Sequence, residues 1–334
     1  MVTPHDESLM RHALNEAWKY QGLTFPNPAV GAVVSNENGE ILGVGAHQKA
    51  GMPHAEVLAL KAAYKHLTND SRINTYENAL ELHAFLSQNH QELFKNLILH
   101  VTLEPCNHFG KTPPCSQLIH TLGLKRVVIG AYDQSSAKGG GSFLSKEGCD
   151  VVYNCLQKEC NELLTPFTCK EEKKPFVFFK MALSANNVAT GGIITSLDSR
   201  KMVHRLRDCC DLLVIGGNTV RLDRPTLDAR LCDGKAPDVL IYSRTENFDK
   251  SIPLFDVHNR HVFIDSNLEK MQTYSMVMVE GGQAMLDALQ KRLKWYLIFR
   301  SPHIKEGQSV TLPEDLREVF SQRIGEDTMS WYVR

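Results

Sequence analysis

The chain is organised around Pro53-His54-Ala55-Glu56, which is followed later by Glu104-Pro105-Cys106 and then by Pro113-Pro114-Cys115. Imidazoles and thiols are zinc ligands, and a catalytic zinc site leaves one of its four tetrahedral positions to water. His54, Cys106 and Cys115 would supply three ligands and leave that fourth position open. Bound zinc lowers the pKa of water from about 15.7 to about 7. The pattern therefore predicts a hydrolytic zinc site, with Glu56 as its proton shuttle.

A similar pattern occurs in zinc nucleobase deaminases, where His-x-Glu precedes Pro-Cys-x-x-Cys and the glutamate acts as general acid and base. Here the two cysteines are further apart than in that pattern. Two alternatives stay open: a deaminase of nucleosides or tRNA bases, and a structural zinc module without turnover. The structural module would need a fourth protein ligand, for which His108 is the candidate because it lies between the cysteines.

The bulk properties exclude several classes of protein. The 334 residues exceed the usual size of one domain, so two domains are expected. A net charge of −1 gives no support for binding nucleic acid, which usually involves a strong basic patch. The first residues are polar without a signal peptide, and no apolar run approaches the roughly 18 residues of a membrane span. Nine irregularly spaced cysteines favour reduced thiols and a cytoplasmic protein.

Hydrophobic periodicity predicts the elements of a first domain, residues 1–150. The pair Asn38-Gly39 between two apolar runs is typical of a β-hairpin. A helix that starts at the double proline would carry Cys115 in its first turn. Proline is tolerated at a helix start, because the N–H that it lacks would have no partner within the helix there. The expected helices span 6–20, 54–66 and the segment from Pro113, and the expected strands span 29–34, 41–45, 97–103 and 126–131.

Three segments look like additions to this domain. Residues 68–96 are polar and indicate an inserted helical excursion, in which His83 and His90 are expected to be exposed to solvent. The glycine run 139–141 indicates a flexible turn. A charged run that ends in a proline closes an expected linker over 151–174.

The second domain, residues 175–334, alternates apolar strands with helices, which predicts an α/β domain with a largely parallel sheet. Glu280-Gly281-Gly282 lies between a strand and a helix, where two glycines let a phosphate approach the backbone or simply form a tight turn. A dinucleotide fingerprint is absent. The expected strands span 175–181, 212–216, 239–242, 261–264, 276–279 and 295–299, and the expected helices span 200–207 and 284–291.

Over nearly its whole length the chain resembles the bifunctional riboflavin-biosynthesis deaminase/reductase family. In the first half the resemblance rests on PNPAVG at 26–31, HQKAG at 47–51, PHAE at 53–56 and TLEPCNHFGKTPPC at 102–115. The last string is highly specific and carries the wide spacing of the two cysteines. The family usually has arginine where this chain has Lys111, which keeps the positive charge but loses the planar guanidinium.

In the second half the resemblance rests on scattered residues and short motifs: Lys180, Ser184, 194–196, Arg207, residues within 219–230, and 280–282. The family usually reads Ser-Leu-Asp-Gly where this chain has Ser184-Ala185-Asn186-Asn187. It usually has an aromatic residue in place of Ile193. These departures leave open a deaminase with a degenerate reductase domain.

The resemblance implies a cytidine-deaminase-like α/β/α domain followed by a dihydrofolate-reductase-like α/β domain, using Zn2+ and NADPH respectively, in a homo-oligomer. The residues implied around NADPH are Ala182, Thr219, Asp223, Gly281 and Gly282. The residues implied to face the reductase substrate are Ser184, Arg207, Leu227, Arg230 and Glu280.

The implied substrate is a phosphorylated pyrimidine, 2,5-diamino-6-ribosylamino-4(3H)-pyrimidinone 5′-phosphate. Zinc hydroxide would add to the ring carbon that bears the 2-amino group, with Glu56 moving the protons. Asn27 suits the edge of the base, and His47 and Lys49 are candidates for the 5′-phosphate. A solvent-facing Lys49 is an equal alternative.

NADPH would then deliver hydride to ribose C1′ and open the sugar to a ribityl chain. Lys180 and Asp223 are expected nearest the reacting carbon. Arg207 and Arg230 suit the substrate phosphate, because guanidinium binds phosphate through two parallel hydrogen bonds.

Overall fold

A five-stranded sheet in the order β2-β1-β3-β4-β5 forms the centre of the first half of the chain. The expected hairpin is present as the antiparallel strands β1 (Gly31–Ser35) and β2 (Ile41–Ala46). β3 (Ile98–Leu103), β4 (Arg126–Ala131) and β5 (Asp150–Val152) run parallel to one another. This computed structural model describes residues 1–110 and 112–334.

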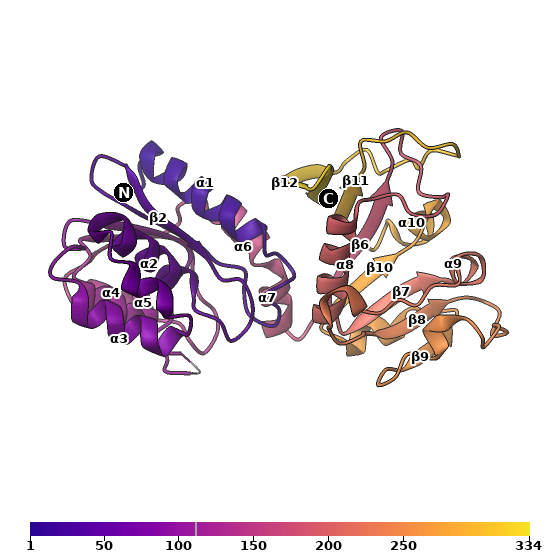
Figure 1. The fold of residues 1–334 in the computed structure, drawn as a ribbon, viewed down its shortest axis with the longest axis horizontal. Helices are drawn as coiled ribbons and strands as arrows, with labels where there is room; N and C mark the ends of the chain where they lie inside the picture. The colour runs from indigo at the N-terminus through magenta and orange to yellow at the C-terminus, as the bar shows by residue number, and fades with distance from the viewer. Residues whose placement is uncertain (111) are drawn as a thin grey trace. The chain divides into compact units, whose positions relative to one another are not determined.

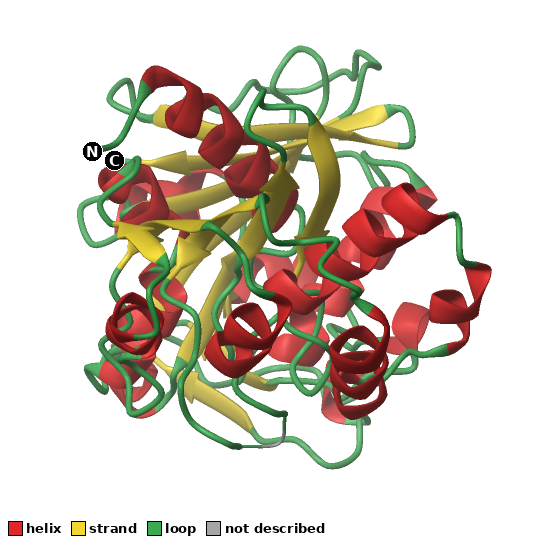
Figure 2. Ribbon diagram, turned by 90° about the vertical axis from the view of Figure 1, so that its left-hand side faces the viewer, coloured by secondary structure: helices red, strands yellow, loops and turns green. Residues whose placement is uncertain are grey.

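Helices pack on both faces of this sheet. They are α1 (Pro4–Trp18), α2 (Ala55–Thr68), α3 (Ala79–Asn89), α4 (Cys115–Leu122), α5 (Gly140–Lys146), α6 (Gln157–Leu163) and α7 (Thr165–Glu171), with a 3₁₀ turn at Ser71–Thr75. α1 and α6 cover one face, and α2 to α5 cover the other (Figure 1). Figure 2 shows helices in red on either side of the yellow strands. The three-layer α/β/α domain expected from the sequence is confirmed.

Glycines on β1 and β2 let the helices approach closely. A Cβ at Gly31 would lie 1.9 Å from the carbonyl oxygen of Ala13 in α1, and one at Gly43 would lie 2.2 Å from that of Ala59 in α2. The close packing fixes α2 against the hairpin, and α2 begins at the predicted metal ligand His54, its N-cap.

The inserted segment 68–96 packs inward. The prediction that His83 is exposed to solvent is wrong. α3 contacts both α2 and α4, and its inner face carries Leu82, His83 and Leu86, with His83 only 8 % exposed. Burial lowers the pKa of His83 to about 4. Apolar residues at i, i+3 and i+7 along this helix would have predicted the inward face. His90 is partly buried.

The expected linker over 151–174 differs from what the structure shows. The chain divides into two units at Glu171/Glu172, and most of the expected linker forms α6 and α7 of the first unit. A hydrogen bond of 2.6 Å from Nε2 of the buried Gln21 to the carbonyl of Leu163 ties the end of α6 to the segment after α1. The apolar residues Cys160 and Leu163, both buried, supply the packing that a charged linker would lack.

The second unit holds an eight-stranded sheet in the order β12-β13-β11-β6-β10-β7-β8-β9. Six strands from β11 to β9 run parallel, which confirms the largely parallel sheet, and β13 and β12 run antiparallel at one edge. The strands are β6 (Phe176–Leu183), β7 (Leu212–Gly216), β8 (Asp238–Tyr242), β9 (Val262–Asp265), β10 (Met276–Glu280), β11 (Trp295–Arg300), β12 (Arg317–Ile324) and β13 (Asp327–Val333).

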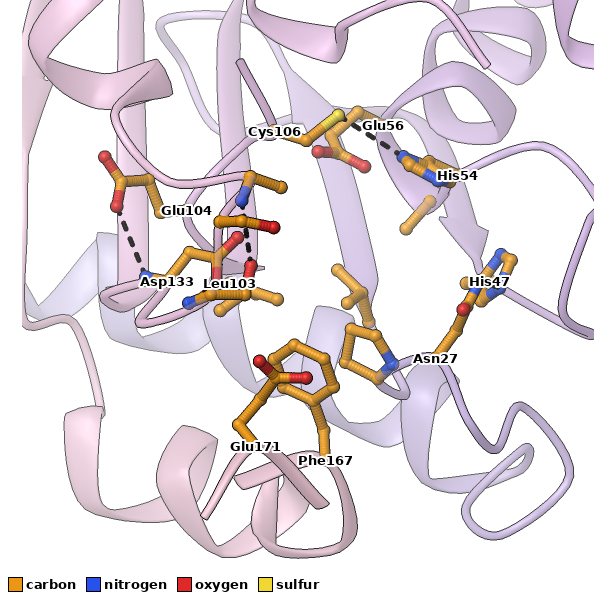
Figure 3. A pocket seen from close by; sticks show the side chains of 16 residues that line it. Asn27, His47, His54, Glu56, Leu103, Glu104, Cys106, Asp133, Phe167 and Glu171 are labelled. Atoms are coloured by element: carbon orange, nitrogen blue, oxygen red, sulfur yellow. Dashed lines mark hydrogen bonds between the residues drawn. The ribbon is translucent and has the colours of Figure 1, made fainter. Parts of the chain in front are cut away.

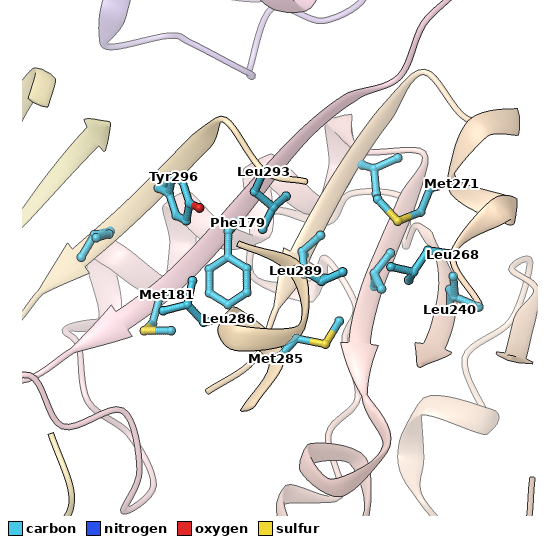
Figure 4. Packing of buried hydrophobic residues seen from close by; sticks show 14 of the residues in the cluster. Phe179, Met181, Leu240, Leu268, Met271, Met285, Leu286, Leu289, Leu293 and Tyr296 are labelled. Atoms are coloured by element: carbon cyan, nitrogen blue, oxygen red, sulfur yellow. The ribbon is translucent and has the colours of Figure 1, made fainter. Parts of the chain in front are cut away.

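Helices α8 (Leu197–Cys209), α9 (Gly217–Asp223) and α10 (Gln283–Leu289) connect these strands, with 3₁₀ turns at Arg230–Cys232, Pro253–Phe255 and Glu269–Thr273. α10 places Leu286 and Leu289 against Phe179 of β6 and Tyr296 of β11 in a buried cluster (Figure 4). This core fixes the positions of the carboxyl ends of the parallel strands. Ligands of parallel sheets bind at those ends.

A buried charge network holds the N-terminus of the first unit. The Asp6 carboxylate, 3 % exposed, accepts hydrogen bonds from Thr3, from His100 Nε2 at 3.0 Å and from Arg126 Nη2 at 3.1 Å. Burial alone would raise the pKa of Asp6, but these bonds and the Arg126 charge outweigh it and lower that pKa. Asp6 thus links α1 to β3 and β4.

The replacement Asp6→Ala is expected to reduce the free energy of unfolding of the first unit by about 3–5 kcal/mol, because it leaves the other members of a buried ion network unpaired. Amide hydrogen exchange in β3 and β4 would measure the loss. Glu7→Ala, which removes an exposed first-turn carboxylate, should cost no more than about 1 kcal/mol. Equal exchange rates in the two variants would contradict the role given to Asp6.

The same network predicts a pH dependence. Because the pKa of folded Asp6 lies below its unfolded value of about 3.9, its stabilisation is fully present above that value. It is lost as the pH falls through the folded pKa. Asp6→Asn should therefore flatten the dependence of β3 hydrogen-exchange free energies on pH below about 4. An unchanged acid slope would contradict this.

Candidate active sites

The three predicted zinc ligands meet at one point of the first unit. The ligand atoms of His54, Cys106 and Cys115 all lie within 4.8 Å of one another. Nδ1 of His54 is 3.6 Å from Sγ of Cys106 and 3.4 Å from Sγ of Cys115. Tetrahedral zinc, with bonds of about 2.1 Å to nitrogen and 2.3 Å to sulfur, holds such atoms roughly 3.6 Å apart. The donor set and its spacing therefore fit zinc.

Local backbone structure explains the convergence of these side chains. His54 is the N-cap of α2 and Cys115 is the first residue of α4, so both stand where a helix has free N–H groups. Cys106, in the loop after β3, accepts a hydrogen bond at Sγ from the Cys115 N–H at 3.4 Å and at its carbonyl from the Ser116 N–H at 3.2 Å. Hydrogen bonding from Cys115 and the neighbouring His54 lowers the pKa of Cys106, which favours the thiolate that binds metal.

The orientation of the histidine ring is set from its other nitrogen. Nε2 of His54 lies 3.5 Å from the hydroxyl oxygen of Thr112. A second partner of this kind fixes the tautomer of a metal-binding histidine and leaves Nδ1 for the ion. His108 is exposed and is not part of the metal-ligating group found among the described residues. Lys111 lies outside the described residues.

Glu56 occupies the second position of α2 and is only 4 % exposed. Burial raises the pKa of its carboxyl group to about 7. A carboxyl group with such a pKa can both take up and release a proton near neutral pH, as a general acid–base catalyst must. Figure 3 shows Glu56 beside Cys106 at one side of a cavity, with His54 next to them.

His47 and Asn27 form another part of the cavity wall. Nδ1 of His47 lies 3.1 Å from the carbonyl oxygen of Pro53, and its Nε2 lies 3.2 Å from Nδ2 of Asn27. A neutral ring satisfies both contacts, donating from Nδ1 and accepting at Nε2. Burial lowers the pKa of His47 to about 4, so the ring is uncharged at neutral pH. The ring contacts the Asn27 amide, and its expected contact with phosphate stays a prediction. Lys49 is exposed outside the cavity lining.

The cavity has a volume of about 270 Å³, and part of its wall was not expected from the sequence. Glu104 accepts hydrogen bonds from the N–H groups of Gly141 at 3.0 Å and Asp133 at 3.2 Å, and so holds the loop 133–137 against the cavity. A Cβ at Gly140 would lie only 1.9 Å from the carbonyl oxygen of Pro105. The glycine run expected to be a flexible turn is therefore a packed helix start.

In the second unit, three predicted residues form a buried charge cluster. Nε and Nη2 of Arg207 lie 3.2 and 2.9 Å from Oε1 of Glu280, and Nζ of Lys180 lies 3.8 Å from Oε2. Burial lowers the pKa of Lys180. Burial acts to raise the pKa of Glu280, but the charges of Arg207 and Lys180 outweigh it and lower that pKa. Glu280 is the last residue of β10 and Lys180 lies opposite it on β6.

A short segment beside this cluster is held by backbone contacts. Arg207 donates to the carbonyl of Asp228 at 3.2 Å, and His204 Nδ1 accepts from the Leu231 N–H at 3.3 Å. Leu227 is buried, whereas Arg230 is exposed and pairs with Asp228 at 2.8 Å. His204 was missed in the sequence, although it lies three positions before Arg207 and hence on the same face of α8.

The Ser184–Asn187 departure from the family pattern keeps a tight turn. Ser184 Oγ donates to Asn186 Oδ1 at 2.7 Å and accepts from the Val188 N–H at 2.9 Å, so Ser184 is occupied within the turn. Asn187, at the usual glycine position, has φ +61°. Asparagine is one of the few residues that tolerate this conformation. Ile193, at the usual aromatic position, is 68 % exposed.

A cleft of about 560 Å³ opens at the carboxyl ends of β7 and β8 and the start of α10. Thr219 and Gly282 line it, and a Cβ at Gly282 would meet no atom within 4 Å. Arg221 and Arg244 add positive charge, so the lining fits a nucleotide with phosphate groups. The predicted residues that do not line the cleft are Ala182, Gly281 and Asp223.

Asp223 is exposed at the end of α9, and no described contact joins it to Lys180. The expected place of Asp223 beside the reacting carbon stays a prediction.

Comparisons with known proteins agree with this division. The family model for the cytidine and deoxycytidylate deaminase zinc-binding region matches residues 3–131, and the model for the RibD C-terminal domain matches residues 175–304. The riboflavin biosynthesis protein RibD of Aquifex aeolicus is 37 % identical over 97 % of this chain and 86 % of its own length. RibD of Synechocystis is 32 % identical over 86 % of this chain and 76 % of its own length.

Among solved structures, a Thermotoga maritima protein aligns with a TM-score of 0.65 at 26 % identity, covering 98 % of both chains. It is a diaminohydroxyphosphoribosylaminopyrimidine deaminase/5-amino-6-(5-phosphoribosylamino)uracil reductase. Acinetobacter baumannii RibD, form 1, shares the fold with a TM-score of 0.61 at 20 % identity. Within the described part of the chain, the helices are too short or too polar to span a membrane.

The ligand geometry predicts that Cys106→Ser will lose zinc. A serine hydroxyl is a poor replacement for a thiolate, so the purified variant should hold far less than the expected one zinc per chain, as measured by atomic emission. Cys149→Ser, which changes a partly buried cysteine outside the ligand group, should retain its zinc. Full zinc content in Cys106→Ser would contradict the site.

Proposed function

The chain belongs to the RibD family of riboflavin-biosynthesis proteins and is a zinc-dependent deaminase and an NADPH-dependent reductase; from this premise we propose how its own residues serve the two reactions. The substrate of the first reaction is 2,5-diamino-6-ribosylamino-4(3H)-pyrimidinone 5′-phosphate, and that of the second is its deaminated product. The observation that carries the proposal is a buried carboxyl group, Glu56, beside three converging metal ligands.

In the deaminase unit, zinc at His54, Cys106 and Cys115 supplies a water of lowered pKa when it is bound. Glu56 takes the proton from the attacking water. It returns that proton to the ring nitrogen and then assists the departure of ammonia. Its buried position beside the metal ligands suits both directions of transfer. Asn27, oriented by the neutral His47, presents its amide to the edge of the pyrimidine.

Glu56→Gln should retain zinc but release ammonia about 10²–10⁴-fold more slowly, because the amide cannot shuttle the proton. Ammonia release from the diaminopyrimidine substrate and zinc content would be measured on the same preparation. Glu40→Gln, on the exposed end of the hairpin, serves as the control. A zinc-loaded Glu56→Gln enzyme with the wild-type rate would refute the assignment.

In the reductase unit, NADPH supplies a hydride to ribose C1′ when it is bound in the cleft that Thr219 and Gly282 line. Opening the sugar breaks the C1′–O4′ bond, and the released oxygen needs one proton. Lys180 is the buried cation suited to donate it, since its lowered pKa eases proton release. Glu280 holds Lys180 and is itself held by Arg207.

The phosphate of this substrate is assigned to Arg230 in preference to Arg207. Arg207 already uses two nitrogens on Glu280. Arg230 is exposed, and its pair with Asp228 is of the exposed kind that contributes about 0–1 kcal/mol. Exchanging that pair for a phosphate therefore costs little. Leu227 supports the same segment from the core.

Lys180→Met should slow NADPH oxidation about 10²–10⁴-fold when the deaminated product is supplied, while ammonia release in the first unit stays unchanged. The near-ultraviolet absorbance of NADPH gives the rate. Lys201→Met changes an exposed lysine of α8 and should have no effect. A Lys180→Met enzyme that oxidises NADPH normally would exclude Lys180 as the proton donor.

We also propose that the protein works in the cytoplasm as a homo-oligomer. No disulfide joins the cysteines among the described residues, as is usual in a reducing compartment. The homo-oligomer follows from the family resemblance. Light scattering of the purified chain would test it, and a monomer at micromolar concentration would contradict it.

A further inference from the structure

Part of the deaminase cavity is built by residues that neither family model covers. The models match 3–131 and 175–304, whereas α7 contributes Phe167 and Glu171 to the lining. Because a general cytidine deaminase region ends before α7, these two side chains are candidates for features that distinguish this substrate from cytidine.

α7 is a fixed part of the first unit. The preceding helix α6 contacts α1 and β4, and its last carbonyl accepts the hydrogen bond of the buried Gln21 at 2.6 Å. At the start of α7, Thr165 Oγ1 donates to the carbonyl of Glu162 at 2.9 Å. The start of α7 is therefore anchored to α6, which is itself packed in this unit.

Both side chains point into the cavity from the side opposite Glu56 and Cys106 (Figure 3). A substrate whose reacting carbon faces the metal ligands would thus turn its far side toward α7. The Phe167 ring offers an apolar surface for the pyrimidine, and the Glu171 carboxylate offers a hydrogen-bond acceptor.

Glu171 differs from the other acidic residues of the lining. Glu104 accepts hydrogen bonds from the backbone N–H groups of Asp133 and Gly141, and Asp133 accepts one from that of Ser135. Glu56 faces the metal ligands. Glu171 pairs with Lys170 at 3.1 Å, and the two side chains are 36 % and 37 % exposed, respectively. Such a pair contributes about 0–1 kcal/mol, so Glu171 can turn to a substrate at little cost.

The pyrimidine numbering identifies the group that Glu171 would meet. In a six-membered ring, position 5 is opposite position 2, and the substrate assigned above carries an amino group at each. With C2 at the metal ligands, the 5-amino group points toward α7. In cytidine the amino group leaves from position 4, and the opposite position 1 carries the sugar.

We propose that Glu171 accepts a hydrogen bond from the 5-amino group of the diaminopyrimidine and that Phe167 packs against the ring beside it. This inference rests on the proposed deaminase substrate. Glu171 thereby acts as a specificity residue for the 5-amino group. A site that accepts a hydrogen bond from a substrate N–H disfavours the analogue that lacks it, because that hydrogen bond cannot form.

The test compares two substrates, the diaminopyrimidine and the same molecule with hydrogen at position 5, by following ammonia release. Wild type should prefer the diaminopyrimidine. Glu171→Ala should lower kcat/KM for the diaminopyrimidine roughly 10- to 100-fold, the range for a hydrogen bond to a charged group, and leave kcat/KM for the analogue nearly unchanged. Glu171→Gln retains an oxygen acceptor, so its kcat/KM for the diaminopyrimidine should lie between those of wild type and Glu171→Ala.

Glu172→Gln, the adjacent exposed carboxylate that pairs with Lys174, is the charge-matched control and should behave as wild type. Phe167→Leu should lower kcat/KM for both substrates alike. Equal losses on both substrates in Glu171→Ala, or no loss on either, would overturn the inference. If wild type released no ammonia from the diaminopyrimidine, the proposed function itself would fail, which is a separate outcome.

Discussion

The convergence of one imidazole nitrogen and two thiol sulfurs is the constraint on which the first unit depends. His54 and Cys115 stand at the starts of α2 and α4, and Cys106 lies in the loop between β3 and α4. A helix start has backbone N–H groups without intrahelical partners, and one of them, that of Cys115, bonds to the sulfur of Cys106. Because α2 begins at a ligand, Glu56 is carried directly to the metal side of the cavity.

The second unit builds its site on a different principle. Its central group is a buried carboxylate, Glu280, shared by Arg207 and Lys180 from other elements. These residues come from a helix and two neighbouring parallel strands, so the cluster depends on the correct sheet order. Burying charged groups costs desolvation energy, which their mutual attraction offsets only when the ion pairs and hydrogen bonds are well aligned. Here the cluster holds a lysine whose pKa is lowered by burial, the group proposed above as the proton donor.

Local motifs allowed much of the deaminase site to be predicted from the sequence. Side chains at His54, Cys106 and Cys115 are close to fixed helix starts, and the proline pair before Cys115 marks one of them. Long-range packing could not be read in the same way. His83 faces inward because α3 lies between α2 and α4, and α6 and α7 belong to the first unit because Gln21 reaches Leu163. Asn187 is a local case in which a departure from the family pattern changes little. It replaces the usual glycine, and the turn is kept.

The most direct test of the account is X-ray absorption spectroscopy at the zinc edge of the purified full-length chain. The account predicts one zinc per chain with two sulfur ligands near 2.3 Å and two nitrogen or oxygen ligands near 2.0–2.1 Å, one of them exchangeable water. A site closed by four protein ligands, or a preparation that takes up no zinc, would contradict it.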